Sequence, residues 1–340
     1  MTFYYIYLFI IIIGSFFLKK RGLFSNFSGD NHQFFSNTGN IPLSGGLFLI
    51  FPIVFFYSYN FILIFFFCII FLIGFFSDRK IIVSPKKRFF FQVVSILLFV
   101  IITDLKIITS RIDLFDILLA NKVFAYLFPT FCLLILINGS NFIDGINGLL
   151  ISYSVIVIYI LGNLGLISDQ IIFDQYFFQI LLLMLLLLLL NIFNILMLGD
   201  GGAYLISFFL GILIINSHQN SPDISPYFYI SLIWYPCFEN LFSILRKLSK
   251  KFSPLNPDNK HLHQLVFFFI KEKFNLSTLF SNNLSSAILV VLNLIIILAC
   301  SLNPVSTIYQ VKLIICSIIL YISGYFFLNK FYKLNFKIEK

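Results

Sequence analysis

A polar segment follows a long apolar run at residues 138–149, where the sequence reads N-G-S-N-F-I-D-G-I-N-G-L. It contains Asn138, Asn141, Asp144 and Asn147. A polar group left unpaired in hydrocarbon is costly, so these side chains must face water, an ion or a ligand at the membrane surface. We therefore predict that this segment forms part of a chemical site, with Asp144 as its ionisable group.

Three other polar segments also follow apolar runs. Ser77 and Asp78 end one run, Asp200 lies among three glycines, and His261 and His263 alternate in a short H-L-H segment. Each segment also has an ordinary interpretation when it is considered alone. Asp78 could belong to a solvated basic loop, the glycines around Asp200 could only break a helix, and His261 and His263 could simply be solvated. Glycines beside Asp200 would also let a phosphate or an ion approach its carboxylate closely.

Carboxylate and amide oxygens suit a hard cation such as Mg²⁺, which often bridges substrate phosphates. Zinc is disfavoured, because no Cys and no third His lies near the H-L-H segment. We therefore predict Mg²⁺ as the cofactor, with Mn²⁺ as the alternative.

The elements that must position these residues are membrane helices. The 340 residues are 60% hydrophobic and 11% charged, whereas soluble domains carry about 25% charged residues. The sequence predicts an all-α, polytopic membrane protein of about 10–11 transmembrane helices, because its apolar stretches are near the length that a spanning helix needs. The predicted spans are residues 3–18, 44–59, 61–77, 89–103, 117–137, 149–167, 176–198, 202–215, 227–245, 283–301 and 306–328.

The basic residues predict the orientation of these helices. Lys and Arg concentrate near residues 19–21, 79–88, 246–273 and 330–340, which alternate spans place on one side of the membrane. Since cytoplasmic loops are enriched in Lys and Arg, we expect the N-terminus outside and the C-terminus inside. The four polar segments then all open to the cytoplasm. We expect one membrane domain over residues 1–340, with a cytoplasmic loop at about 246–282 that is too short for a core of its own.

A family resemblance connects these segments. The chain resembles the polyprenyl-phosphate N-acetylhexosamine-1-phosphate transferases, and its H-L-H-Q form is more similar to the N-acetylglucosamine type than to the peptidoglycan branch. The motifs that carry the resemblance occur in the family's order: P-L-S-G-G (42–46), G-F-F-S-D-R-K (74–80), S-P-K-K-R-F-F-F-Q (84–92), N-G-S-N-F-I-D-G-I-N-G-L (138–149), L-G-D-G-G-A-Y (198–204), Y-P-C-F-E-N-L-F-S-I-L-R (235–246) and P-D-N-K-H-L-H-Q-L (257–265).

The resemblance implies a reaction at the cytoplasmic face of a bacterial inner membrane. A UDP-N-acetylhexosamine gives its sugar-1-phosphate to a polyprenyl (undecaprenyl) phosphate, UMP leaves, and a lipid-linked surface glycan such as O-antigen is begun. The expected partners are these two substrates and the membrane. A homodimer is left open, and no nucleic acid is expected because the net charge of +9 follows from the asymmetry of the loops.

The resemblance also implies roles for individual residues. Asp200 and Asn141 match metal ligands. The catalytic candidates are Asp78, Asp144, His261 and His263, with Asp78 near the attacking phosphate and the histidines near the nucleotide phosphates. The substrate-binding candidates are Lys86, Lys87, Arg88, Asn138, Asn147 and Gly201.

The sequence departs from the family at several of these positions. Ser77 stands where the family commonly has the first of two Asp residues, and Asn147 stands where many members have a second Asp. Three alternatives stay open: a phospho-N-acetylmuramoyl-pentapeptide transferase, a membrane transporter, and an inactive relative that binds lipid phosphate. The transporter is disfavoured because the polar groups concentrate at one membrane face.

Overall fold

The computed structural model describes residues 2–25, 41–56, 60–167, 174–253 and 260–335. Within these ranges every regular element is a helix, and the predicted all-α fold is confirmed. The helices are α1 (Thr2–Arg21), α2 (Gly45–Phe56), α3 (Phe61–Asp78), α4 (Pro85–Thr103), α5 (Asp113–Leu119), α6 (Lys122–Ile143), α7 (Leu149–Asn163), α8 (Asp174–Ile192), α9 (Gly199–Asn220), α10 (Pro226–Leu232), α11 (Trp234–Ser249), α12 (Leu262–Phe274), α13 (Thr278–Ser301) and α14 (Thr307–Asn335).

Each predicted span contains a helix or a broken pair of helices. In the described part of the chain, α3, α6, α9, α13 and α14 are long and apolar enough to cross a membrane on their own, and α10 with α11 makes a sixth crossing if the bent pair is one span. The chain is therefore a multi-pass membrane protein. The end of the predicted span 44–59 lies outside the described residues, and so does part of the loop at 246–282.

The structure corrects the predicted span at 227–245, which is two helices that meet at 77°. Pro236 has no N–H to donate to the Leu232 carbonyl, so the helix cannot continue through this point. The hydroxyl of Tyr153 on α7 donates a hydrogen bond to that carbonyl at 2.7 Å. The break therefore leaves no unpaired Leu232 oxygen inside the bundle.

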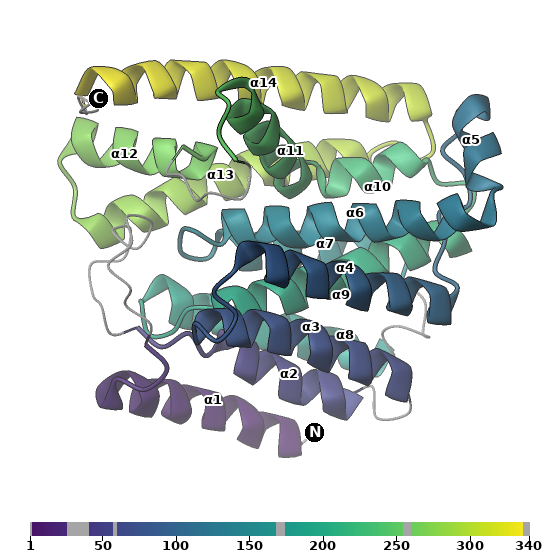
Figure 1. Ribbon diagram of the computed structural model, residues 1–340. Coiled ribbons are helices and arrows are strands. Elements are labelled where there is room, and N and C mark those ends of the chain that lie inside the picture. Colours follow the sequence, from purple (N-terminus) through teal and green to yellow (C-terminus); the bar gives the residue numbers. More distant parts are fainter. Residues whose placement is uncertain (1, 26–40, 57–59, 168–173, 254–259, 336–340) are drawn as a thin grey trace.

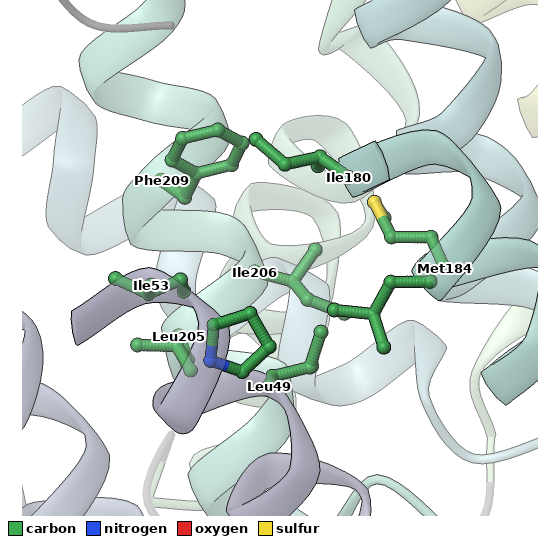
Figure 2. Close-up of a pocket in the computed structure, with 9 residues that line it drawn as sticks. Leu49, Ile53, Ile180, Met184, Leu205, Ile206 and Phe209 are labelled. Atoms are coloured by element: carbon green, nitrogen blue, oxygen red, sulfur yellow. The ribbon is translucent and has the colours of Figure 1, made fainter. Parts of the chain in front are cut away.

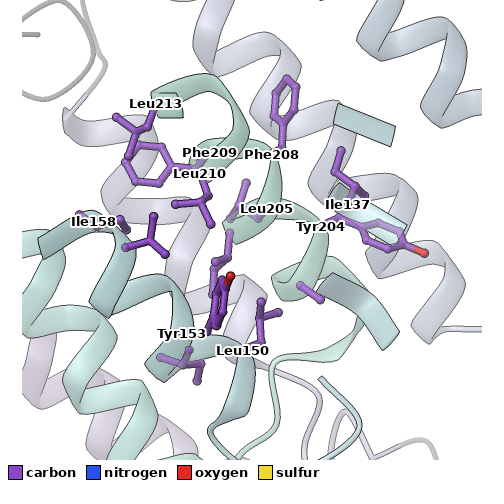
Figure 3. Packing of buried hydrophobic residues seen from close by; sticks show 14 of the residues in the cluster. Ile137, Leu150, Tyr153, Ile158, Tyr204, Leu205, Phe208, Phe209, Leu210 and Leu213 are labelled. Atoms are coloured by element: carbon purple, nitrogen blue, oxygen red, sulfur yellow. The ribbon is translucent and has the colours of Figure 1, made fainter. Parts of the chain in front are cut away.

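Helix α9 forms the centre of the bundle. Nearly all of its residues are buried, and it packs against α2, α3 and α6. Figure 3 shows Leu205, Phe208 and Leu210 of α9 among apolar side chains of neighbouring helices. A side chain at Gly74 of α3 would collide with the backbone of Gly201, so glycine at this position lets α3 and α9 approach backbone to backbone.

A small pocket lies between α2, α8 and α9 (Figure 2). Its lining is apolar and includes Leu49, Met184 and Phe209. These side chains cannot bind a phosphate or a metal ion, so the chemical site has to be sought elsewhere.

The polar segments gather at one end of the bundle. In Figure 1, α3 and α6 end, and α4 begins, toward the left of the view, where the last residues of α14 also lie. This juxtaposition of segments far apart in sequence agrees with the predicted sharing of one membrane face. Which face is cytoplasmic, the single-domain organisation and the homodimer stay predictions.

Candidate active site

The end of α3 and the start of α9 are joined by Asp78. Its carboxylate accepts hydrogen bonds from the backbone N–H of Asp200 at 2.9 Å and of Gly201 at 3.2 Å. These N–H groups have no partner within α9, and the helix dipole favours a negative charge at this end. Gly199 has φ +71°, and a side chain there would lie 2.5 Å from the Asp78 carboxylate. The glycines of this motif therefore make room for Asp78.

Ser77 links Asp200 to Arg88 of α4. The Ser77 hydroxyl donates to Asp200 Oδ2 at 2.7 Å and accepts from Arg88 Nη1 at 2.9 Å, and the same Nη1 lies 2.9 Å from Asp200 Oδ2. The side chains of Arg88 and Asp200 stay about one-quarter exposed, so a ligand can reach the pair. Lys86 and Lys87 are exposed on the first turn of α4, and neither has a described contact with Asp200.

Asp144 adds a third carboxylate. It follows the last residue of α6, and burial together with the charges of Asp200 and Asp78 raises its pKa well above the usual range. Asn141 lies one turn earlier on the same helix and is half-buried.

The donor set of this acidic cluster fits Mg²⁺. The carboxylates of Asp78, Asp144 and Asp200 interact electrostatically and Asp200 pairs with the Arg88 guanidinium, so a divalent cation would relieve the excess of negative charge. Among the described residues, no group of three or more His, Cys, Asp or Glu side chains is placed so that it could hold a metal ion. Mg²⁺ is commonly held by one or two carboxylates together with waters and substrate phosphates, which is what Asp200, Asn141 and Asp144 could offer.

The two histidines lie beside Phe142 and Gly145, at the end of α6. Their rings stack with centroids 5.7 Å apart, and the His261 ring also lies 4.8 Å from that of Phe142. His263 is fully buried, and a side chain at Gly145 would meet its Nε2 at 2.6 Å. Burial lowers the pKa of His263 to about 3, so its ring is uncharged near neutral pH. His263 therefore packs beneath the loop and His261 lies between it and Phe142.

The predicted substrate-binding amides lie in buried hydrogen-bond networks. Asn138 donates to Gln92 of α4 at 3.1 Å. The side chain of Asn147 donates to Asn194 at 2.7 Å, and its backbone N–H donates to Asn282 at 2.7 Å. The structure thus gives both residues a part in holding the 138–149 segment in place.

Sequence reasoning assigned no role to several polar side chains that surround the site. Each is a single amide or carboxylate in or beside an apolar run, a signal that is visible in the sequence but does not say which partner it meets. These residues are Gln92, Asn191, Asn194, Glu239, Asn282 and Asn283.

The fold and this cluster define a multi-pass helical membrane protein with an acidic site at one end of its bundle. Residues 60–218, which include α3, α4, α6 and the start of α9, match the model of glycosyl transferase family 4. This central part of the chain is similar to glycosyl transferase family 4.

Curated relatives carry a more specific name. The undecaprenyl-phosphate alpha-N-acetylglucosaminyl 1-phosphate transferase of Yersinia pestis is 30% identical over 166 residues, 46% of this chain and 45% of the relative. The protein of the same name from Escherichia coli strain K12 is 28% identical over 173 residues, 48% of this chain and 47% of the relative. The chain spans about half the length of the curated relatives that it matches. These names agree with the expected resemblance and do not favour the peptidoglycan alternative.

Proposed function

We propose that this protein transfers an N-acetylhexosamine-1-phosphate from a UDP-sugar to a polyprenyl phosphate at the cytoplasmic face of a bacterial inner membrane. The observation that carries the proposal is the cluster of Asp78, Asp144, Asp200 and Arg88, which lies at one end of the bundle and within the residues that match the family. The names of the curated relatives support N-acetylglucosamine as the sugar.

The proposed reaction balances as a single phosphoryl transfer. An oxygen of the lipid phosphate forms a bond to the phosphorus that carries the sugar, and the bond from that phosphorus to the UMP oxygen breaks. The products are a lipid-linked pyrophosphoryl sugar and UMP. Such a reaction depends chiefly on bringing two anionic substrates together and on neutralising the charge that develops.

The residues of the acidic cluster and of the start of α4 have different roles in this proposed reaction, according to where they lie. Arg88 is the partly exposed cation of the cluster and can bind a phosphate oxygen, while Ser77 and Asp200 hold its guanidinium in place. Asp78 fixes the start of α9 and so the position of Asp200. Mg²⁺, when held by Asp200, Asn141 and Asp144, would supply charge neutralisation at the transferred phosphate. Lys86 and Lys87 are exposed and could attract the lipid phosphate from a distance.

A general base at position 77 is not needed for this reaction. The Ser77 hydroxyl donates a hydrogen bond to Asp200 and accepts one from Arg88, so its part in the site is to hold these two side chains together. The second ionisation of a phosphate monoester has a pKa of about 6, so the acceptor lipid is already largely a dianion near neutral pH.

The test is transfer of radiolabelled phosphosugar from a panel of UDP-N-acetylhexosamines to undecaprenyl phosphate by the purified chain, with and without Mg²⁺. We expect a lipid-linked product, stoichiometric UMP and dependence on the metal. Asp200→Asn should abolish turnover while the variant still inserts and folds. Absence of product from every donor with folded protein would overturn the proposal, and an active Asp200→Asn variant would overturn the metal role of Asp200.

A further inference from the structure

Arg79 is a half-buried cation beside the acidic cluster that the proposed reaction does not yet use. It follows Asp78 at the end of α3, and its positive charge acts on the Asp78 carboxylate. Its Cζ atom lies 4.1 Å from the centroid of the Phe24 ring and 5.4 Å from that of Phe75. Among the residues that the structure describes, none accepts a hydrogen bond from this guanidinium. Arg79 is therefore held by aromatic rings and keeps its hydrogen-bond donors for another partner.

Stacking and hydrogen bonding use different parts of a guanidinium. The aromatic ring covers a face of the plane, whereas the five N–H groups point outward along its edge. An arginine stacked on an aromatic ring can therefore still bind a phosphate, and its planar fork of donors matches two phosphate oxygens at once. Because the stack already orients the side chain, less conformational entropy is lost when the ligand arrives.

The backbone at Phe24 places its ring against Arg79. Phe24 has φ +61°, a left-handed conformation that is an outlier for a bulky residue. Its carbonyl accepts a hydrogen bond from the N–H of Leu43 at 2.9 Å, and Leu43 pairs with Met197 in a β-bridge, three residues before Asp200. Such backbone strain persists where surrounding contacts enforce it, and it is concentrated at functional sites. Backbone contacts thus connect the ring under Arg79 to the start of α9.

This stack lies at the end of a peripheral helix. In Figure 1, α1 runs along the lower edge of the bundle, and its last turn lies at the same end as the last turn of α3. Tyr5, Phe9 and Phe16 of α1 are more than half exposed, as expected of apolar side chains that face lipid. His261 lies elsewhere, against Phe142. A phosphate carried by a lipid could therefore reach Arg79 from the headgroup layer beside α1.

We propose that Arg79 binds the phosphate of the acceptor lipid and that Phe24 orients its guanidinium. This inference rests on the proposed function. A phosphate monoester has three terminal oxygens, so a guanidinium that binds two of them leaves the third to attack the sugar-bearing phosphorus. Arg88 already donates hydrogen bonds to Ser77 and Asp200, whereas Arg79 has its full set of guanidinium donors to offer.

The first test measures the Michaelis constants of both substrates. Arg79→Gln removes the charge and the fork of donors, and Lys80→Gln is the matched control, because it removes the same charge from the next residue, which is exposed. Loss of a hydrogen bond to a charged group corresponds to about 10-fold or more in affinity. We expect Arg79→Gln to raise KM for undecaprenyl phosphate by this factor, with KM for the UDP-sugar within about 2-fold.

Lys80→Gln should leave both constants within about 2-fold of wild type. A rise in KM for the UDP-sugar and not for the lipid would overturn the assignment of Arg79 to the acceptor.

A third variant separates the stack from the charge. Phe24→Leu keeps Arg79 and removes the ring beneath it, and Phe17→Leu removes a ring that lies 5.7 Å from Cζ of Arg21 on the exposed side of α1. A cation–π contact at a partly exposed site corresponds to about 3-fold in affinity. We expect KM for the lipid to rise about 3-fold in Phe24→Leu and to stay unchanged in Phe17→Leu. Because Phe24→Leu retains the charge at position 79, it also serves if Arg79→Gln does not fold.

A second readout does not require turnover. Farnesyl phosphate carries the same phosphate on a shorter polyprenyl chain, and its ³¹P resonance reports binding to the detergent-solubilised protein. We expect Arg79→Gln to bind it about 10-fold more weakly than wild type or worse, and Lys80→Gln to bind it like wild type. Equal binding by wild type and Arg79→Gln overturns the proposal. An equal loss in Arg79→Gln and Lys80→Gln also overturns it, because the ligand would then respond only to the overall charge of the segment.

The two readouts separate this inference from the proposed function. If no donor gives product but Arg79→Gln alone weakens the binding of farnesyl phosphate, the transferase proposal fails while the lipid-phosphate site stands. If transfer is observed and Arg79→Gln keeps the wild-type KM for undecaprenyl phosphate, the role of Arg79 is overturned while the transferase proposal stands.

Discussion

Oδ1 of Asp78 accepts a hydrogen bond from the backbone N–H of Asp200 at 2.9 Å, across 122 residues of sequence. The residue at the end of one membrane helix thus caps the first turn of the central helix. One consequence is that substitutions at Asp78 affect the stability of the bundle as well as any chemistry. The predictions below separate the two.

Replacing Asp78 by Asn should destabilise the fold. An Asn side chain has one acceptor oxygen where Asp has two, and its amide group would face the N–H groups at the start of α9. Loss of such a cap costs about 1 kcal/mol. The measurement is thermal unfolding in detergent followed by circular dichroism, with transfer activity assayed below the Tm of the variant.

Asp116→Asn is the matched control for Asp78→Asn. Asp116 accepts hydrogen bonds from Thr109 and Ser110 in the segment around α5 and has no described contact with the acidic cluster. Its replacement should leave transfer unchanged. If Asp78→Asn unfolds like the wild-type protein, the capping role is wrong.

Arg88→Gln should lower transfer at least about 100-fold, because a charge-assisted hydrogen bond in such a site is worth about 3 kcal/mol. Lys87→Gln removes the same charge from the preceding residue, which is exposed, and should stay within about 2-fold at moderate salt. Initial rates at saturating donor and acceptor make the comparison. Equal losses in the two variants would mean that the basic segment acts only through its overall charge.

Gly74→Ala should destabilise the bundle. The new methyl group would lie 2.5 Å from the Cα atom and the N atom of Gly201, so α3 and α9 would have to move apart. Overpacking of this kind costs about 1–3 kcal/mol. Gly324→Ala on α14 is the control, since no atom lies within 4 Å of the added carbon and alanine favours the helix. The Tm of Gly74→Ala should fall below wild type, and that of Gly324→Ala should not.

Stability should fall as the pH drops below the ordinary pKa of histidine. His263 has a pKa of about 3 in the folded protein, whereas an unfolded histidine titrates near 6.5. Between these values the unfolded state binds a proton that the folded state does not, so the free energy of unfolding decreases as the pH falls through this window. At pH 5 the loss from this residue is about 2 kcal/mol relative to pH 7.

The corresponding measurement compares wild type with His263→Gln. The variant loses the titrating group, so its Tm should change less between pH 7 and pH 5 than that of the wild-type protein. Parallel pH profiles for the two proteins would show that His263 titrates normally in the folded state.

Part of this arrangement could be predicted from sequence, because helix length and loop charge constrain a membrane protein strongly. Apolar runs gave the helices, and their parity brought Asp78 and Asp200 to the same end, where the structure shows them in contact. The same reasoning grouped Arg88 with Lys86 and Lys87, because loop charge predicts the side of the membrane. It does not predict which side chains of α4 face the rest of the bundle. Only the structure separates Arg88, which meets Asp200, from its exposed neighbours.

The contact between Tyr321 and Glu239 was beyond sequence reasoning for a related reason. Tyr321 lies in an apolar helix, where a tyrosine is ordinary, and Glu239 lies 82 residues away. Their pairing depends on how α11 bends away from α10 and on which face α14 presents to it. Neither property follows from hydrophobic periodicity.

The bend at Pro236 and the contact from Tyr321 also have a consequence for the synthesis and membrane insertion of the protein. Chains are made from the N-terminus and fold domain by domain as they emerge. Asp78, Arg88, Asp144 and Asp200 are all synthesised before α11 and α14. A ribosome-bound intermediate would hold the acidic cluster without the contact between Tyr321 and Glu239. The buried Glu239 carboxylate therefore gains its hydrogen bond from Tyr321 only after α14 has been inserted.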